Sequence, residues 1–414
     1  MINLPVSKSL GARFLVATYF AGTLPADPFF EDNEDLMVLQ QALLEIFSDE
    51  EPIDYGDSPI DVGSSGTALR FVAAVCASSP GADYVINGSP RLMRRPMLPM
   101  IDLLRKAGAT IEILGPESTG PYRVKGAKIE GGDFSIRADI SSQFISAAML
   151  VSPYWEKGMK LTFTTDPVSK PYIDMTAKLM EKMGIKVKLD TREVEIKPGN
   201  YREPFGFKVE ADWSAAAFFY EACALGAKDV IISNLVAPDK SLQGDSSANS
   251  IFKKLGVRAD FSSKETSLSL VDEKDEKVEI DFTNFPDLLL PFAVASLLSD
   301  TKFRFTGLSH IRLKESDRIE SLKSEASKLG YCLSEGEEFI EWEGETSVKE
   351  DDPVIDPHDD HRVAMAFAIA ALKTGRIKIA HPEVVEKSFI NFWNQLPEIG
   401  LACENQNGVM IVKK

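Results

Sequence analysis

The sequence predicts a mixed α/β fold of two similar domains, each with three βαβαββ repeats around buried helices. A chain of 414 residues is too long for one ordinary domain. Short β-rich pieces alternate with helical patterns along its whole length. Six segments also share one design, a small or charged polar turn followed by a helix-length run of Ala and larger apolar residues: Ser7–Ala17, Ser64–Ala77, Ser141–Val151, Asp212–Leu225, Asp287–Leu298 and Asp360–Leu372.

These six segments recur at nearly regular intervals. The steps between their aligned helix starts are 57, 76, 70, 75 and 74 residues. A nearly fixed period indicates copies of one supersecondary unit. The aligned starts are Arg13, Arg70, Ser146, Ala216, Pro291 and Met365.

The connecting stretches supply the other elements of each repeat. The β-rich pieces include Tyr84–Gly88, Lys186–Leu189 and Val230–Ile232. Several helices end in a glycine that a strand-like run follows, because glycine readily takes the left-handed backbone of a helix end. The predicted amphipathic helices are Met97–Ala107, Tyr172–Met183, Ser246–Leu255 and Arg318–Leu329. Near the end of the chain, Gly408–Val412 predicts one extra strand.

The repeat helices are nearly apolar on all sides. Ala364–Leu372, for example, contains no charged residue. A helix of this kind has to be buried. Six of them with small Ala faces predict two compact cores with three helices each.

Composition excludes several classes of protein. The hydrophobic share of 44% and charged share of 26% are typical of a soluble globular protein. We expect no membrane span and no signal peptide, because no apolar run approaches the roughly 18 residues of a span. Four widely separated cysteines favour reduced thiols over disulfides or a zinc site: Cys76, Cys223, Cys332 and Cys403.

The charge of the chain excludes one more partner. A formal net charge of −17 argues against nucleic-acid binding. Salt screens charges beyond ~8 Å, so a local cluster of Lys and Arg can still hold a small anion.

The predicted helix starts carry groups suited to anions. Ser7, Lys8, Ser9 and Arg13 surround the first of them. Free backbone N–H groups and the helix dipole attract anions there, and Arg offers a planar fork to carboxylate or phosphate. The same chemistry recurs in Gly63–Arg70, Arg91–Pro96, Ser141–Gln143, Ser169–Tyr172, Arg312–Arg318, Asp359–Arg362 and Glu386–Phe389.

Each motif taken alone also has a purely structural interpretation. The basic clusters are equally typical of solvated helix ends, and Ser141–Gln143 of an ordinary cap. Asp287 is either a cap or a partly buried base, and Glu315 either a surface ion-pair partner or an acid among cations. His358 and His361 have the spacing of metal ligands, but no other Cys or His lies nearby in sequence, so we expect no metal.

Taken together and in order, these motifs resemble the 5-enolpyruvylshikimate-3-phosphate synthase family. The resemblance runs from the first residues to about Phe392 and implies two domains of three βαβαββ units, composed of residues 1–7 with 212–414 and of residues 8–211. The matching motifs are Leu4-Pro5, Ser7-Lys8-Ser9, Arg13, Gly66-Thr67-Ala68, Arg70, Arg95-Pro96, Ser141-Ser142-Gln143, Ser169-Lys170-Pro171-Tyr172, Pro286-Asp287, Lys314-Glu315, Asp317-Arg318, Asp360-His361-Arg362, Lys387 and Phe389.

The resemblance implies transfer of the enolpyruvyl group of phosphoenolpyruvate to the 5-hydroxyl of shikimate 3-phosphate, with loss of phosphate from a tetrahedral adduct. It implies no cofactor and no metal, only small-molecule substrates, and a monomer in the cytoplasm. The implied catalytic residues are Asp287 as base, Glu315 as acid, Lys8 and His361. Those implied for shikimate 3-phosphate are Lys8, Ser9, Arg13, Ser141, Ser142, Gln143, Ser169, Asp287 and Lys314. Those implied for phosphoenolpyruvate are Lys8, Gly66, Arg95, Gln143, Arg318, Arg362 and Lys387.

This chain departs from the family pattern at several points. The family usually has one more strand before the Leu4-Pro5 motif, and we expect the extra strand of the tail to occupy the edge that this leaves, beside Ile2–Pro5. Val6 stands in place of a common glycine, and His310 in place of an asparagine that often contacts substrate.

Two alternative functions stay open. One is the sister enzyme that acts on UDP-N-acetylglucosamine, although its reactive Cys before the Arg-Pro pair is absent. The other is a non-catalytic binding relative.

Overall fold

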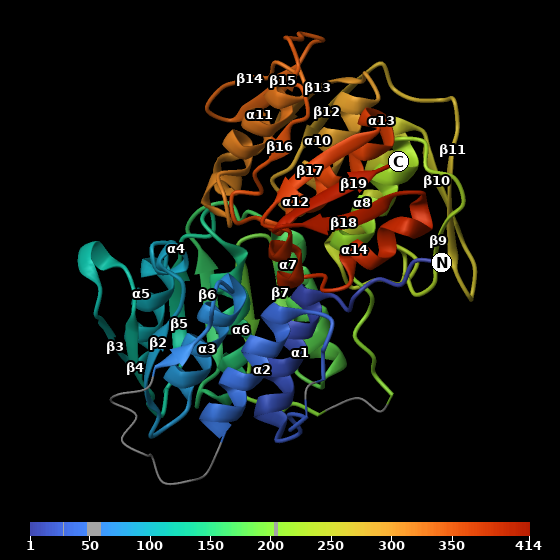
Figure 1. Ribbon diagram of the computed structural model, residues 1–414. Helices are drawn as coiled ribbons and strands as arrows, with labels where there is room; N and C mark the ends of the chain where they lie inside the picture. The colour runs from blue at the N-terminus through green and yellow to red at the C-terminus, as the bar shows by residue number, and fades with distance from the viewer. Residues whose placement is uncertain (28, 48–58, 203–205) are drawn as a thin grey trace. The chain divides into compact units, whose positions relative to one another are not determined.

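The computed structural model describes residues 1–27, 29–47, 59–202 and 206–414 (Figure 1). Its contacts divide the chain into two compact units. Unit 1 comprises Met1–Ser7 with Glu210–Lys414, and unit 2 comprises Lys8–Val209. The chain returns to unit 1 at Glu210, two residues before the position that the family resemblance implies.

Unit 2 begins with two helices and continues with two complete repeats. Its helices are α1 (Lys8–Ala21), α2 (Glu34–Phe47), α3 (Gly66–Ser78), α4 (Pro90–Met93), α5 (Leu98–Ala107), α6 (Ser142–Val151) and α7 (Lys170–Lys182). Its strands are β1 (Ile60–Asp61), β2 (Asp83–Asn87), β3 (Thr110–Ile113), β4 (Tyr122–Lys125), β5 (Gly132–Ile136), β6 (Met159–Phe163), β7 (Val187–Leu189) and β8 (Glu193–Ile196).

Unit 1 holds the remaining three repeats. Its helices are α8 (Trp213–Ala224), α9 (Ala248–Ile251), α10 (Leu289–Leu298), α11 (Arg318–Lys328), α12 (His361–Ile369), α13 (Ala371–Thr374) and α14 (Phe392–Gln395). Its strands are β9 (Val230–Ile232), β10 (Val257–Phe261), β11 (Thr266–Leu270), β12 (Lys277–Asp281), β13 (Lys302–Thr306), β14 (Ser334–Glu335), β15 (Phe339–Trp342), β16 (Val354–Ile355), β17 (Arg376–Ala380), β18 (Ala402–Gln406) and β19 (Val409–Lys413). Short 3₁₀ helices that carry site residues are η6 (Pro286–Leu288), η7 (Ser309–Leu313) and η8 (Pro382–Lys387).

Four of the sheets share one topology, which confirms the predicted mixed α/β repeat fold. Their strand orders are β1-β2-β4-β3, β5-β6-β8-β7, β12-β13-β15-β14 and β16-β17-β19-β18. In each, the first two strands are parallel and the other two pairings are antiparallel. A parallel pair needs a crossover, and one buried helix of each repeat supplies it.

The N-terminal residues complete the fourth repeat. Its sheet has the order β10-β11-β9, and Ile2 forms a parallel bridge with Ile232 on the free side of β9. Ile2 therefore occupies the position that a first strand takes in the other sheets. The first repeat differs, because α1 and α2 are joined there by no strand in the described residues.

The predicted strand at the end of the chain exists, but its expected place beside Ile2–Pro5 is wrong. The tail forms two strands, β18 and β19, and β19 pairs with β17 along five residues. Figure 1 shows these red strands together in unit 1, where β17 packs on α12. The tail thus completes the sixth repeat and the N-terminus the fourth.

The repeat helices form the two cores, as predicted from their composition. In unit 2, α1, α3 and α6 pack against one another, and in unit 1, α8, α10 and α12 do the same. Every residue of α10 and of α12 is buried. Each large apolar side chain buried here contributes about 1.5–3 kcal/mol. Rigid cores of this kind fix the positions of the helix starts.

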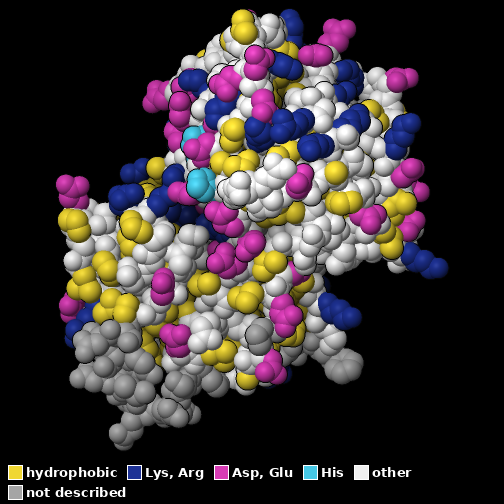
Figure 2. All heavy atoms as spheres, viewed as in Figure 1, with side chains coloured by type: hydrophobic (Ala, Val, Ile, Leu, Met, Phe, Trp, Pro, Cys, Tyr) yellow, Lys and Arg dark blue, Asp and Glu magenta, His cyan; other side chains and the backbone are white. Residues whose placement is uncertain are grey.

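The helices in the described ranges are all too short or too polar to cross a bilayer. Figure 2 shows Lys and Arg side chains intermixed with Asp and Glu over the face in view.

Candidate functional site

Arg318 is the centre of a charged cluster in unit 1 that also contains Asp287, Glu315, Asp360 and Arg362, hereafter the unit 1 cluster. Its side chain is 1% exposed. Nη1 donates to Asp287 Oδ1 at 2.8 Å, Nη2 to Glu315 Oε2 at 3.1 Å, and Nε to Asp360 Oδ2 at 2.8 Å. One guanidinium therefore joins the starts of α10, α11 and α12.

Asp360 fixes the start of α12 as a helix cap. Its Oδ1 accepts the backbone N–H of Arg362 at 3.0 Å, and its Oδ2 also accepts the Ser316 hydroxyl at 3.2 Å. The side chain is fully buried, and its lone pairs are satisfied by these donors and Arg318. Arg362, in the first turn of α12, is thereby aimed at Asp287.

Both oxygens of Asp287 face arginine. Arg362 Nη2 lies 2.8 Å from Oδ2, opposite the contact of Arg318 with Oδ1. Burial favours the neutral acid, but the positive charges of Arg362, Lys314 and Arg318 hold the pKa of Asp287 well below its ordinary value. Asp287 is therefore a carboxylate that two cations restrain.

Two further titratable groups lie close to this carboxylate. Burial, reinforced by the charge of Asp287, raises the pKa of Asp245 to about 6, although Ser214 donates a hydrogen bond to it. Burial, reinforced by Lys314, lowers the pKa of His310 to about 3, so its ring is neutral at pH 7. The sequence analysis missed Asp245, which stands directly before the third amphipathic pattern, after Gly244.

In unit 2, Arg13 plays a comparable joining role. The side chain is buried, and Nε donates to Thr176 Oγ1 at 2.7 Å, Nη1 to the Ser9 carbonyl at 2.7 Å and Nη2 to Ser146 Oγ at 3.0 Å. These bonds hold together the first two turns of α1, α6 and α7. Burial lowers the pKa of Arg13 to about 10, and the partners named here are all neutral.

Gln143 links α6 to the start of α3. Its Nε2 donates to Thr67 Oγ1 at 2.9 Å, and its backbone N–H is capped by Ser141 Oγ at 3.3 Å. Gly66 opens α3 at a position that two arginine side chains crowd. A Cβ at this position would lie 2.5 Å from Arg95 Nη1 and 2.7 Å from Arg70 Nη1.

The remaining predicted residues of unit 2 also lie at helix starts. Lys8 begins α1 and pairs with Asp35 of α2 at 3.1 Å, a partner that the sequence analysis did not identify. Ser169 precedes α7 with a left-handed backbone (φ 53°) and is buried. Ser142 is buried in the first turn of α6.

In unit 1, Lys387 ends η8 and is buried, and His361 is buried at the start of α12. Among the described residues, no three His, Cys, Asp or Glu side chains are grouped as metal ligands. His358, the other residue of the suspected metal motif, instead donates or accepts a hydrogen bond with Glu325.

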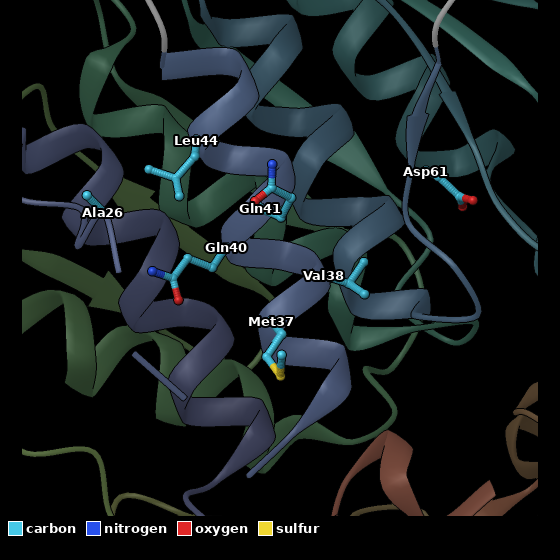
Figure 3. Close-up of a pocket in the computed structure, with 7 residues that line it drawn as sticks. All are labelled: Ala26, Met37, Val38, Gln40, Gln41, Leu44 and Asp61. Carbon is cyan, nitrogen blue, oxygen red and sulfur yellow. The ribbon is translucent and has the colours of Figure 1, made fainter. Parts of the chain in front are cut away.

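The cavity in Figure 3 lies away from these predicted residues. It has a volume of about 350 Å³ and is lined along α2 by Met37, Val38, Gln40, Gln41 and Leu44, together with Ala26 and Asp61. Gln40 has its amide occupied, because Nε2 donates to the carbonyls of Pro25 and Asp27. We assign no ligand to this cavity.

The comparisons with known proteins agree on one family. The family model described as EPSP synthase (3-phosphoshikimate 1-carboxyvinyltransferase) matches residues 25–396. A Bacteroides fragilis protein named 3-phosphoshikimate 1-carboxyvinyltransferase is 35% identical over 97% of this chain and 96% of its own length. A Vibrio cholerae protein of the same name is 29% identical, with 96% of each chain covered. An EPSP synthase structure from Acinetobacter baumannii shares the fold, with a TM-score of 0.71 at 22% identity over 99% of this chain and 96% of that one.

Proposed function

The chain belongs to the EPSP synthase family, and from this premise we propose that it transfers the enolpyruvyl group of phosphoenolpyruvate to the 5-hydroxyl of shikimate 3-phosphate, releasing phosphate. The observation that carries the chemistry is the pair of buried arginines, Arg318 and Arg362, which converge on the single carboxylate of Asp287. Such a pair suits a substrate with a carboxylate and a phosphate, since guanidinium groups bind both.

We propose that the anionic groups of phosphoenolpyruvate compete with Asp287 for these two arginines. Competition would free the oxygens of Asp287 and raise its pKa toward that of a useful base. Asp287 then takes the proton of the 5-hydroxyl group while the hydroxyl oxygen bonds to C2 of phosphoenolpyruvate. Glu315, held by Arg318 at 3.1 Å, gives a proton to the methylene carbon.

The adduct then collapses to the product. The methyl group formed in the first step loses a proton, the C2–O bond to phosphate breaks, and the enol ether double bond forms. We propose that Lys8 and His361 assist this chemistry. No metal or organic cofactor takes part in these steps.

The substrate contacts follow the helix starts. We propose that shikimate 3-phosphate is held by Lys8, Ser9, Arg13, Ser141, Ser142, Gln143, Ser169, Asp287 and Lys314. We propose that phosphoenolpyruvate is held by Lys8, Gly66, Arg95, Gln143, Arg318, Arg362 and Lys387. Arg13 supports this assignment, because a buried cation among neutral partners is costly unless an anion joins it.

We further propose that the enzyme acts as a monomer in the cytoplasm. Sedimentation with and without substrates tests the oligomeric state. A substrate-dependent dimer would contradict it.

An assay of phosphate release tests the reaction. The purified chain is mixed with phosphoenolpyruvate and either shikimate 3-phosphate or UDP-N-acetylglucosamine. We expect phosphate only with shikimate 3-phosphate. Turnover with the UDP-sugar alone would support the sister enzyme, and binding of both substrates without turnover would indicate a non-catalytic relative.

A further inference from the structure

Glu325 is a buried carboxylate outside the residues assigned above. It lies on α11, seven residues after Arg318, and its side chain is 0% exposed. Seven residues are two helical turns, so Glu325 and Arg318 share one face of α11. An ionised carboxylate at such a position is stable only with several donors.

Glu325 receives two donors from the segment that leads into α12 and two from α11 itself. Its Oε1 lies 2.9 Å from His358 Nε2, and its Oε2 accepts the backbone N–H of Asp356 at 2.9 Å. Lys328 Nζ binds Oε2 at 2.6 Å and also donates to the Val354 carbonyl at 2.9 Å. Ser324 Oγ donates to Oε1 at 3.2 Å.

The segment held in this way has an unfavourable backbone. His358 and Asp359 are both left-handed, with φ of 51° and 59°. Non-glycine residues are strained in this region, because their Cβ lies too close to the neighbouring carbonyl oxygen. Tertiary contacts have to hold such a conformation. At the first strained residue, the Asp356 carboxylate accepts the His358 N–H at 2.8 Å, and Glu325 holds the His358 ring from the neighbouring helix.

The strained segment ends at the residue that caps α12. The Asp360 N–H donates to the Pro357 carbonyl at 2.8 Å, and the Asp360 carboxylate binds Arg318 and caps Arg362. Helix α11 therefore holds the start of α12 through two contacts. Arg318 binds Asp360, and Glu325 binds His358.

We infer that the Glu325–His358 pair is a positioning device for Arg362, and hence for the phosphoenolpyruvate half of the reaction. The inference rests on the proposed function. Neither residue touches a substrate. When the pair is broken, the segment 356–359 relaxes toward ordinary backbone, the first turn of α12 shifts, and the Arg362 guanidinium loses its alignment.

The test compares Glu325→Gln, His358→Asn and the double variant with the wild type. Asn tolerates the left-handed backbone but its shorter side chain does not reach Glu325, so His358→Asn removes the bond at a partly exposed position. The matched control is Glu320→Gln on the same helix, where an exposed carboxylate pairs with Lys323 at 3.8 Å.

We expect the KM for phosphoenolpyruvate to rise about tenfold in both single variants, in line with the cost of a misplaced binding group. The KM for shikimate 3-phosphate should stay within about twofold, because its proposed contacts lie chiefly in unit 2. The double variant should be no worse than the worse single variant, as expected for one shared contact. Amide hydrogen exchange should accelerate at the start of α12 in His358→Asn and not in Glu320→Gln.

The outcomes separate the two proposals. Wild type without turnover overturns the proposed function and this inference with it. Active wild type with an unchanged KM for phosphoenolpyruvate in His358→Asn overturns the inference alone. A parallel rise in both KM values would also overturn it, because a general loosening of the fold would then explain the effect. Should Glu325→Gln fail to fold, His358→Asn decides the question.

Discussion

Arg318 Nη1 donates to Asp287 Oδ1 at 2.8 Å, so the proposed base is bound to a group that is also proposed to bind substrate. Arg362 binds the other oxygen of the same carboxylate. A base that is restrained this strongly abstracts protons poorly, since the pKa of Asp287 is held well below its ordinary value. The unit 1 cluster is therefore best described as a resting arrangement, in which Asp287 binds the arginines that are proposed to hold the substrate.

Replacing Asp287 by Asn tests this competition. The amide cannot take a proton at neutral pH, so kcat should fall by about 10²–10⁴. The two arginines lose the carboxylate that they share, although Arg318 keeps Glu315 and Asp360. Phosphoenolpyruvate or inorganic phosphate should therefore bind the variant several-fold more tightly than the wild type. Calorimetric titration measures the affinity and steady-state kinetics the rate.

The matched control for this prediction is Asp260→Asn, which removes an exposed carboxylate on β10. It should change neither quantity. Weaker anion binding in Asp287→Asn would contradict the competition, even if kcat falls.

Replacing Arg13 by Ala should chiefly weaken binding of shikimate 3-phosphate. Loss of hydrogen bonds from a charged donor costs about 1.5–3 kcal/mol, which corresponds to roughly a 10–100-fold higher KM. The fold should survive, because Thr176 Oγ1 keeps its bonds to the Tyr172 carbonyl and to Ser146. Arg192→Ala, which removes an exposed ion pair with Asp166 in the same unit, should leave the KM unchanged. An equal loss in kcat and in affinity would contradict the binding role.

Replacing Gly66 by Ala should raise the KM for phosphoenolpyruvate and spare that for shikimate 3-phosphate. The new methyl group would overlap Arg95 Nη1 and Arg70 Nη1, so the Arg95 side chain has to move. Stability should change little, because the crowded atoms are the far ends of two long side chains. Thermal unfolding and the two KM values decide the matter. A lower melting temperature with both KM values raised would instead indicate damage to the start of α3.

The fold was predictable because its signals are local and repeated. All-apolar runs such as that in α10 have to be buried, and their spacing gives the repeat. The place of the tail was not predictable, because strand pairing between β17 and β19 depends on contacts that no local pattern encodes.

The site was predictable as residue types and not as partners. Asp287, Arg318 and Arg362 stand out at helix starts, but their mutual contacts join positions up to 75 residues apart. The sequence distinguishes Glu325 only weakly, through its two-turn spacing from Arg318 on an amphipathic helix. Its bond to His358 depends on a left-handed backbone that only the structure shows.

The last prediction concerns Glu221 and the stability of the fold. Glu221 lies in the middle of α8 and is fully buried, and neither carboxyl oxygen has a hydrogen-bond partner in the part of the chain that the structure describes. Burial raises the pKa of Glu221 well above its ordinary 4.5. The folded state therefore binds one more proton than the unfolded state from about that pH upward, so stability falls as pH rises through this window.

Replacing Glu221 by Met removes the buried polar group and keeps the volume. We expect a gain of about 1–3 kcal/mol near pH 4, where the substitution removes a neutral acid without partners. The gain should be larger at pH 8, because the unfolded state of the wild type is then further stabilised by ionisation of Glu221. Glu221→Gln should also flatten the pH dependence but stabilise less, because the amide still lacks partners. Melting curves from pH 4 to 8 measure all three proteins. A wild-type curve parallel to that of Glu221→Met over this range would show that Glu221 does not titrate with folding.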